Sequence, residues 1–137
     1  MCGIAGYIGA SKHPAISYRL ATRLFERLDQ RGEDASGYYG VQGEVVHYHK
    51  QPTRSAIYVR GDAWKGMSDK DCEVLILHAR GASQGVGSPK DNKNNHPFVN
   101  QERSLALIHN GRVTDDEYKS LLPRYAVEST CDSEILM

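Results

Sequence analysis

The sequence predicts a single α+β domain, because short apolar strands recur between amphipathic helical segments. Three runs are apolar enough to form buried strands, at 3–8, 73–80 and 104–110. Two other segments, 14–30 and 114–122, have the spacing and composition of helices. The 137 residues suffice for one domain with one modest core, and neither a repeat nor a linker divides them.

The chain is expected to begin with a strand and a long helix. The run GIAGYI at 3–8 is apolar and partly β-branched, which is typical of a buried strand. Pro14 is expected to open a helix that extends to about Gln30. Its apolar stripe recurs every four residues, at Ile16, Leu20, Leu24 and Leu28.

A loop and a hairpin are expected to follow. The segment RGEDASG at 31–37 contains two glycines and two acidic residues and indicates a loop. The β-rich runs at 36–41 and 44–50 flank a Gln-Gly pair and predict a β-hairpin. Residues 52–67 are ambiguous, with a possible short helix.

The second half alternates strands with polar connections. EVLILHAR at 73–80 predicts a strongly apolar strand with a polar end, and 81–98 predicts a long loop rich in Gly, Asn, Ser and Pro. SLALIHN at 104–110 predicts another buried strand. A helix over 114–122 starts at a Thr-x-x-Glu capping box, and 132–137 has the character of a helix that has just begun.

Composition argues against several classes of protein. Seventeen basic and seventeen acidic residues give a formal net charge of zero, which predicts neither a nucleic-acid partner nor an acidic membrane surface. No apolar run approaches the ~18 residues of a membrane span and no signal peptide is recognisable, so we expect a cytoplasmic protein. The three cysteines show no CxxC spacing, and His47 and His49 have no evident third ligand, so no metal site is expected.

Chemically useful residues gather in five ordered motifs: MCGIAG, RGEDASG, HARGASQG with NNHPF after it, IHNG and STCDSE. Each alone is a weak signal, since HNG also fits a plain turn and DSE a helix cap. Together they resemble the glutaminase domain of class II glutamine amidotransferases, which are N-terminal-nucleophile hydrolases. The resemblance is greatest to the branch of glucosamine-6-phosphate synthase and amidophosphoribosyltransferase, and it covers nearly the whole chain.

This resemblance implies hydrolysis of the glutamine side-chain amide to glutamate and ammonia, with Cys2 as the nucleophile. Removal of Met1 would leave Cys2 with a free α-amine, which titrates near pH ~8 and can act as a base beside its own thiol. Asn110 and the backbone N–H of Gly111 match the family's oxyanion hole, where one donor is worth ~3 kcal/mol of transition-state stabilisation. We expect no cofactor for this chemistry.

The resemblance also implies how free glutamine is bound. Arg80 matches the family arginine that holds the α-carboxylate, and Asp132 matches the aspartate that receives the α-ammonium. Ser83 stands where the family usually has threonine, and its hydroxyl is expected to bind the carboxylate. His96 matches a histidine near the site, for which a supporting role and a purely structural one remain open.

The fold implied by the resemblance is a four-layer α/β/β/α sandwich with two stacked antiparallel sheets. The family domain is considerably longer than this chain, so we expect a C-terminal truncation that removes several strands and any synthetase domain. An incomplete sheet exposes an edge and an apolar face, so we expect a partner or self-association to cover them. The ammonia is expected to pass to an acceptor domain or subunit.

Two other functions remain open at this level. One is a catalytically impaired module that binds glutamine or serves in regulation, and the other is a hydrolase of the same superfamily that acts on a different amide. The pairing of Arg80 with Asp132 suits a free amino acid and argues against the second. Gly81 stands where tryptophan is usual and Gln84 where histidine is usual, which leaves the acceptor open.

Overall fold

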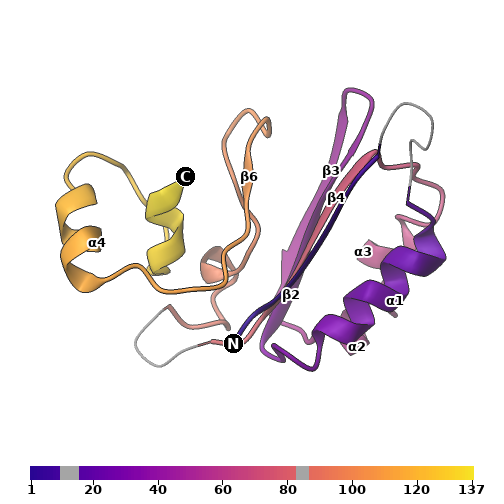
Figure 1. Cartoon of the computed structure of the whole chain (residues 1–137), viewed down its shortest axis with the longest axis horizontal. Helices are drawn as coiled ribbons and strands as arrows, with labels where there is room; N and C mark the ends of the chain where they lie inside the picture. Colours follow the sequence, from indigo (N-terminus) through magenta and orange to yellow (C-terminus); the bar gives the residue numbers. More distant parts are fainter. Residues whose placement is uncertain (10–15, 83–86) are drawn as a thin grey trace.

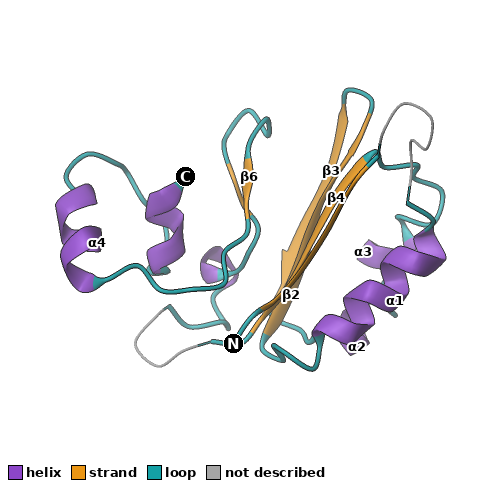
Figure 2. Cartoon of the chain, viewed as in Figure 1, coloured by secondary structure: helices purple, strands orange, loops and turns teal. Residues whose placement is uncertain are grey.

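The computed structural model describes residues 1–9, 16–82 and 87–137 of the chain. Its strands and helices are interspersed along the sequence, as Figures 1 and 2 show. The elements are β1 (Gly3–Ile8), α1 (Tyr18–Leu28), β2 (Ala35–Gln42), β3 (Val45–Gln51), α2 (Ser55–Tyr58), α3 (Asp62–Lys65), β4 (Val74–Arg80), the 3₁₀ helix η1 (Asn92–Asn94), β5 (Phe98–Val99), β6 (Ala106–Leu107), α4 (Asp115–Leu121) and the 3₁₀ helix η2 (Asp132–Leu136).

A four-stranded antiparallel sheet forms the centre of the fold, with strand order β1-β4-β2-β3. The strands at 3–8 and 73–80 and the hairpin are therefore confirmed. Gly3 pairs with Ala79, and Ala35 pairs with Arg80, so the starts of β1 and β2 both lie at the end of β4. This register brings Cys2 beside Arg80 and Gly81 at the end of β4.

The prediction of a loop over 31–37 is wrong for residues 35–37, because β2 already begins at Ala35. Gly37 is a buried strand residue that packs closely against another segment. A Cβ atom there would collide with the backbone oxygen of His96 and the ring of Pro97. The glycine therefore permits a close approach between segments, which from sequence alone is indistinguishable from a turn signal.

Helices α1, α2 and α3 cover one face of the sheet (Figure 1). The core between them is aromatic: Trp64 and Phe25 are almost fully buried, with ring centroids 5.1 Å apart. Tyr38 of β2 meets the Trp64 ring edge-on at 5.5 Å. Burial of each such side chain contributes ~1.5–3 kcal/mol. The short helices α2 and α3 confirm the possible helix in 52–67.

The buried face of α1 differs from the expected stripe. The expected start at Pro14 lies outside the described residues, and α1 begins at Tyr18. Ala21 and Phe25 are buried, whereas Leu20 is 52% and Leu24 37% exposed. A strict four-residue repeat advances ~40° around the helix at each step, so it cannot keep one face toward a flat sheet.

The two-stranded sheet β5–β6, together with α4 and η2, lies on the opposite side of the four-stranded sheet from α1 (Figures 1 and 2). The capping box of α4 is confirmed: the Thr114 hydroxyl accepts from Glu117 N, and the Glu117 carboxylate accepts from Thr114 N. The segment at 132–137 forms a 3₁₀ rather than an α-helix.

The strand expected at 104–110 is much shorter in the structure. Only Ala106–Leu107 pairs, because its partner β5 is itself two residues long. The residues that follow leave the pair and bond instead to the central sheet, through the backbone oxygen of His109 and the side chain of Asn110. None of the helices in the described ranges is long and apolar enough to cross a membrane.

Candidate active site

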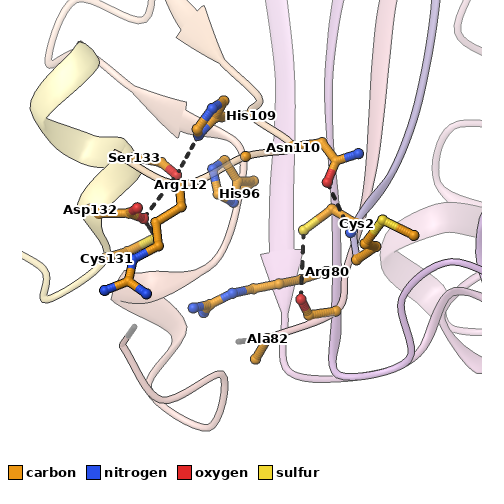
Figure 3. A pocket seen from close by; sticks show the side chains of 13 residues that line it. Cys2, Arg80, Ala82, His96, His109, Asn110, Arg112, Cys131, Asp132 and Ser133 are labelled. Atoms are coloured by element: carbon orange, nitrogen blue, oxygen red, sulfur yellow. Dashed lines mark hydrogen bonds between the residues drawn. The ribbon is translucent and has the colours of Figure 1, made fainter. Parts of the chain in front are cut away.

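A cavity of about 310 Å³ opens where the start of β1 meets the end of β4 and faces η2 (Figure 3). Five separate stretches of sequence contribute its walls: the N-terminus, the end of β4, His96, the segment before α4 and the residues around the start of η2. Thirteen residues line it: Met1, Cys2, Arg80, Gly81, Ala82, His96, His109, Asn110, Gly111, Arg112, Cys131, Asp132 and Ser133.

Cys2 is the link between β1 and the segment after β6. Its thiol donates to the Gly81 backbone oxygen at 3.9 Å, and its backbone N–H donates to Oδ1 of Asn110 at 3.2 Å (Figure 3). Gly81 has no room for a side chain, because a Cβ there would lie 2.6 Å from the Met1 backbone oxygen. The glycine that departs from the family's tryptophan therefore lets the N-terminal backbone pass close by.

The segment that carries Asn110 and Gly111 is fixed by two contacts of His109, one through its backbone oxygen and one through its ring. The buried ring of His78 lies with Nε2 at 3.2 Å from the His109 backbone oxygen, and a carbonyl only accepts, so Nε2 carries the proton. Nδ1 of His109 lies 2.9 Å from the Ser133 hydroxyl. Gly111 must be small here too, since a Cβ would come within 2.5 Å of the His109 ring.

Arg80 enters the cavity from the end of β4. It is 3% exposed, and its guanidinium donates to Oδ1 of Asn95 at 2.9 Å and to the Gly87 backbone oxygen at 2.7 Å. A buried guanidinium whose position is fixed by such bonds is suited to bind a carboxylate. Ser83, expected to assist it, lies outside the described residues.

Asp132 begins η2 on the opposite wall from Cys2 (Figure 3). Its carboxylate accepts from Val113 N at 2.7 Å and from the Ser133 hydroxyl at 3.3 Å. The neighbouring Cys131 thiol is buried, and burial raises its pKa. Cys131 is therefore a poor nucleophile even though it lines the cavity.

His96 lies between Arg80 and His109 in the cavity (Figure 3) and is 3% exposed. Neither of its ring nitrogens has a hydrogen-bond partner among the residues that the structure describes. Its ring packs 4.2 Å from that of His78 and edge-on to Phe98. Burial, with electrostatic repulsion from His78 and Arg80 that opposes protonation, lowers the pKa of His96 to about 2, so the ring is neutral.

The structure brings Cys2, Arg80, His96, Asn110 and Gly111 to one cavity together with Asp132. Four supporting residues were missed from the sequence. Asn94, Asn95, His78 and His109 lie inside the recognised motifs but were not singled out. The only available signal was the clustering of polar residues immediately beside each predicted site residue.

The histidine pair His47 and His49 lies on β3. Nδ1 of His49 lies 2.6 Å from the Tyr58 hydroxyl, which gives it a structural partner. Within residues 1–9, 16–82 and 87–137, no group of three metal-ligating side chains comes together.

Comparison with curated proteins found relatives along the whole chain. It is 33% identical over 146 aligned residues to the glutamine–fructose-6-phosphate aminotransferase (isomerizing) of Chlorobaculum tepidum, with 100% of this chain and 22% of the relative covered. The proteins of that name from Staphylococcus epidermidis and Staphylococcus aureus are 32% and 31% identical, with 20% and 22% of their length covered. No protein-family model matches the chain.

The chain thus spans about one fifth of the length of these curated relatives. The resemblance of the five motifs is confirmed: the chain is homologous over its full length to glutamine–fructose-6-phosphate aminotransferases, whose N-terminal domain is a class II glutamine amidotransferase.

Proposed function

We propose that this chain hydrolyses the side-chain amide of glutamine, with Cys2 as the nucleophile once Met1 has been removed. The observation that carries the proposal is the convergence of Cys2, Asn110, Arg80 and Asp132 on one cavity. A thiol, an amide donor, a buried cation and a carboxylate are the groups that amide hydrolysis of a free amino acid requires.

The first step is attack of the Cys2 thiol on the amide carbon. The α-amine released by loss of Met1 takes the thiol proton and then delivers it to the leaving ammonia. The nitrogen of Cys2 already lies 3.2 Å from Oδ1 of Asn110, which holds it at the cavity. With Oδ1 engaged, the Nδ2 group of Asn110 and the N–H of Gly111 serve as oxyanion donors. Water then hydrolyses the Cys2 thioester to glutamate.

The substrate is held by one positive and one negative side chain. Arg80 binds the α-carboxylate of glutamine, and Asp132 binds the α-ammonium. His96 adds no charge because its ring is neutral, and Arg112, the other cation of the lining, pairs with Asp115 at 3.1 Å. Arg80 and Asp132 therefore remain to match the two charges of a zwitterion. The two ring nitrogens of His96 lack partners among the described residues, and the bound amino acid supplies one.

The ammonia is proposed to pass to an acceptor domain or subunit. The curated relatives are named as aminotransferases for glutamine and fructose 6-phosphate, and the chain corresponds to about one fifth of their length. We propose that residues 1–137 form the N-terminal part of a four-layer α/β/β/α domain. The order of α1–α3, the four-stranded sheet, β5–β6 and the α4–η2 layer supports this (Figure 1).

A second candidate is a module that binds glutamine without turnover. While Met1 remains in place, the nitrogen of Cys2 belongs to a peptide bond and cannot act as a base. Met1 itself lines the cavity, and its backbone lies against Gly81. The two functions therefore differ in whether Met1 is removed.

The deciding experiment is an intact mass spectrum before and after exposure to a glutamine-mimicking diazoketone, with glutamate release measured in parallel. Hydrolysis predicts loss of Met1, one adduct that maps to Cys2, and protection by excess glutamine. The Cys2→Ala chain should give no adduct, whereas Cys131→Ala should react as the parent does. A chain that retains Met1 and binds glutamine without releasing glutamate would establish the binding module instead.

A further inference from the structure

Two adjacent asparagines are buried beside the cavity, although they lie in a polar connection. Asn94 is 2% and Asn95 is 1% exposed. Both side-chain amides are hydrogen-bonded through oxygen and nitrogen, so each is fixed in orientation. Their partners lie on different segments, and each asparagine reaches toward a different end of the proposed amino-acid site.

Asn95 fixes the carboxylate-binding end. Its Oδ1 accepts from Nη1 of Arg80 at 2.9 Å. Its Nδ2 donates to the Pro89 backbone oxygen at 2.8 Å and to Oδ1 of Asn92 at 3.2 Å, and its own backbone oxygen accepts from Nζ of Lys50. The guanidinium of Arg80 is thereby bonded to Asn95, which makes three further hydrogen bonds, two through Nδ2 and one through its backbone oxygen.

Asn94 fixes the ammonium-binding end. Its Oδ1 accepts from the backbone N–H of Thr130 at 2.9 Å and from the Thr130 hydroxyl at 3.1 Å. Its Nδ2 donates to the Ser88 backbone oxygen at 3.0 Å. Thr130 lies two residues before Asp132, so this anchor sets where the backbone enters η2.

We propose that Asn94 and Asn95 are positioning residues that set the separation between Arg80 and Asp132, and thereby select a ligand with an α-carboxylate and an α-ammonium. This inference rests on the proposed use of the cavity as an amino-acid site. The two asparagines are adjacent in the chain and both are fixed by hydrogen bonds. The positions of Arg80 and Asp132 are therefore both fixed relative to the same short segment. Neither asparagine touches the ligand, and each acts through its partner.

The test measures ligand affinity by calorimetry, so that it does not depend on turnover. All variants are made in the full chain carrying Cys2→Ala, which prevents hydrolysis. Three amides are compared: L-glutamine, glutaramate, which lacks the α-ammonium, and 4-aminobutanamide, which lacks the α-carboxylate. A general loss of structure would weaken all three ligands alike, whereas loss of one anchor would not.

We expect a crossed pattern. Asn95→Leu should weaken glutamine and glutaramate by about tenfold and leave 4-aminobutanamide within about twofold. Asn94→Leu should weaken glutamine and 4-aminobutanamide by a similar factor and leave glutaramate unchanged. Asn100→Ala is the matched control, because Asn100 makes comparable bonds in the β5–β6 turn, to Ser104 and Leu105, and should change none of the affinities.

Two milder variants keep the test decisive where a leucine prevents folding. Asn95→Asp keeps an oxygen that accepts from Arg80, but its carboxylate competes with the ligand carboxylate for the guanidinium. It should therefore lower the affinity only for the two ligands that carry a carboxylate. Thr130→Val removes one donor to Asn94 and should weaken only the two ligands that carry an ammonium. Equal weakening of all three ligands, no change, or no binding of any ligand by the parent would overturn the inference.

The outcome is separable from that of the proposed hydrolysis. A crossed pattern with no glutamate released by the Cys2-containing chain would leave the positioning role standing and exclude turnover. Glutamate release that depends on Cys2, without the crossed pattern, would support hydrolysis and exclude the positioning role.

Discussion

Acidification from pH 7 to pH 5 is expected to destabilise the folded chain, because two histidines beside the cavity are buried as neutral rings. Burial lowers the pKa of His78 to about 4 and that of His96 to about 2, with neighbouring positive charge adding to the second shift. In the unfolded chain both titrate near ~6.5. Between these values the unfolded state binds more protons, so stability rises with pH and falls on acidification.

The magnitude follows from the distance between pH 5 and the unfolded pKa. For each histidine that stays neutral in the fold, the free energy of unfolding falls by ~1.4 kcal/mol per pH unit below ~6.5. At pH 5 this gives ~2 kcal/mol per histidine and ~4 kcal/mol for the pair. Burial also lowers the pKa of His49, which adds in the same direction. The bond from Arg54 lowers the pKa of Asp29, but its contribution is lost only at more acidic pH.

Urea unfolding at pH 7, 6 and 5 measures this directly. The free energy of unfolding should fall by ~4 kcal/mol without a change in the dependence on urea. His96→Phe is the informative variant, because the described residues offer the His96 nitrogens no partner to lose. It should retain the stability at pH 7 and show about half the loss at pH 5. A parent chain equally stable at pH 7 and 5 would refute the reasoning.

Three further outcomes are expected. Phe25→Ala removes a fully buried ring from the aromatic core and should lower the free energy of unfolding by ~3–5 kcal/mol, measured by urea unfolding. Gly111→Ala should slow glutamate release on the order of 100-fold, because a Cβ within 2.5 Å of the His109 ring displaces Asn110 and Gly111, the proposed oxyanion donors; unchanged turnover would contradict that geometry. Thr114→Ala removes one half of the capping box and should cost ~1 kcal/mol, with Ser120→Ala as a control on the same helix.

Much of the fold could be predicted because its strands are locally encoded. The runs at 3–8 and 73–80 are apolar enough for the local sequence alone to predict a strand, and they form β1 and β4. The short extent of β6 could not be predicted, since the run continues through Ile108 while His109 and Asn110 bond across to His78 and Cys2. Such tertiary bonds override local strand propensity.

The candidate site shows the same division. Cys2, Arg80 and Asn110 were predicted from motifs, and the structure brings them together. Asn94 and Asn95 were not, because asparagines in a polar connection are usually exposed. Their burial depends on Arg80 and Thr130, which lie 15 and 36 residues away along the chain. A local pattern carries no information about partners at such separations.

The strand order has a consequence for the timing of synthesis. β1 pairs with β4 within the described sheet, and about 70 residues separate them along the chain. At translation rates of about 5–20 residues per second, β1 waits roughly 4–14 s on the ribosome before its partner exists. During that interval the residues around Cys2 have no strand partner and stay accessible, as the proposed removal of Met1 requires. The topology thereby leaves time for the proposed removal of Met1 before the cavity assembles.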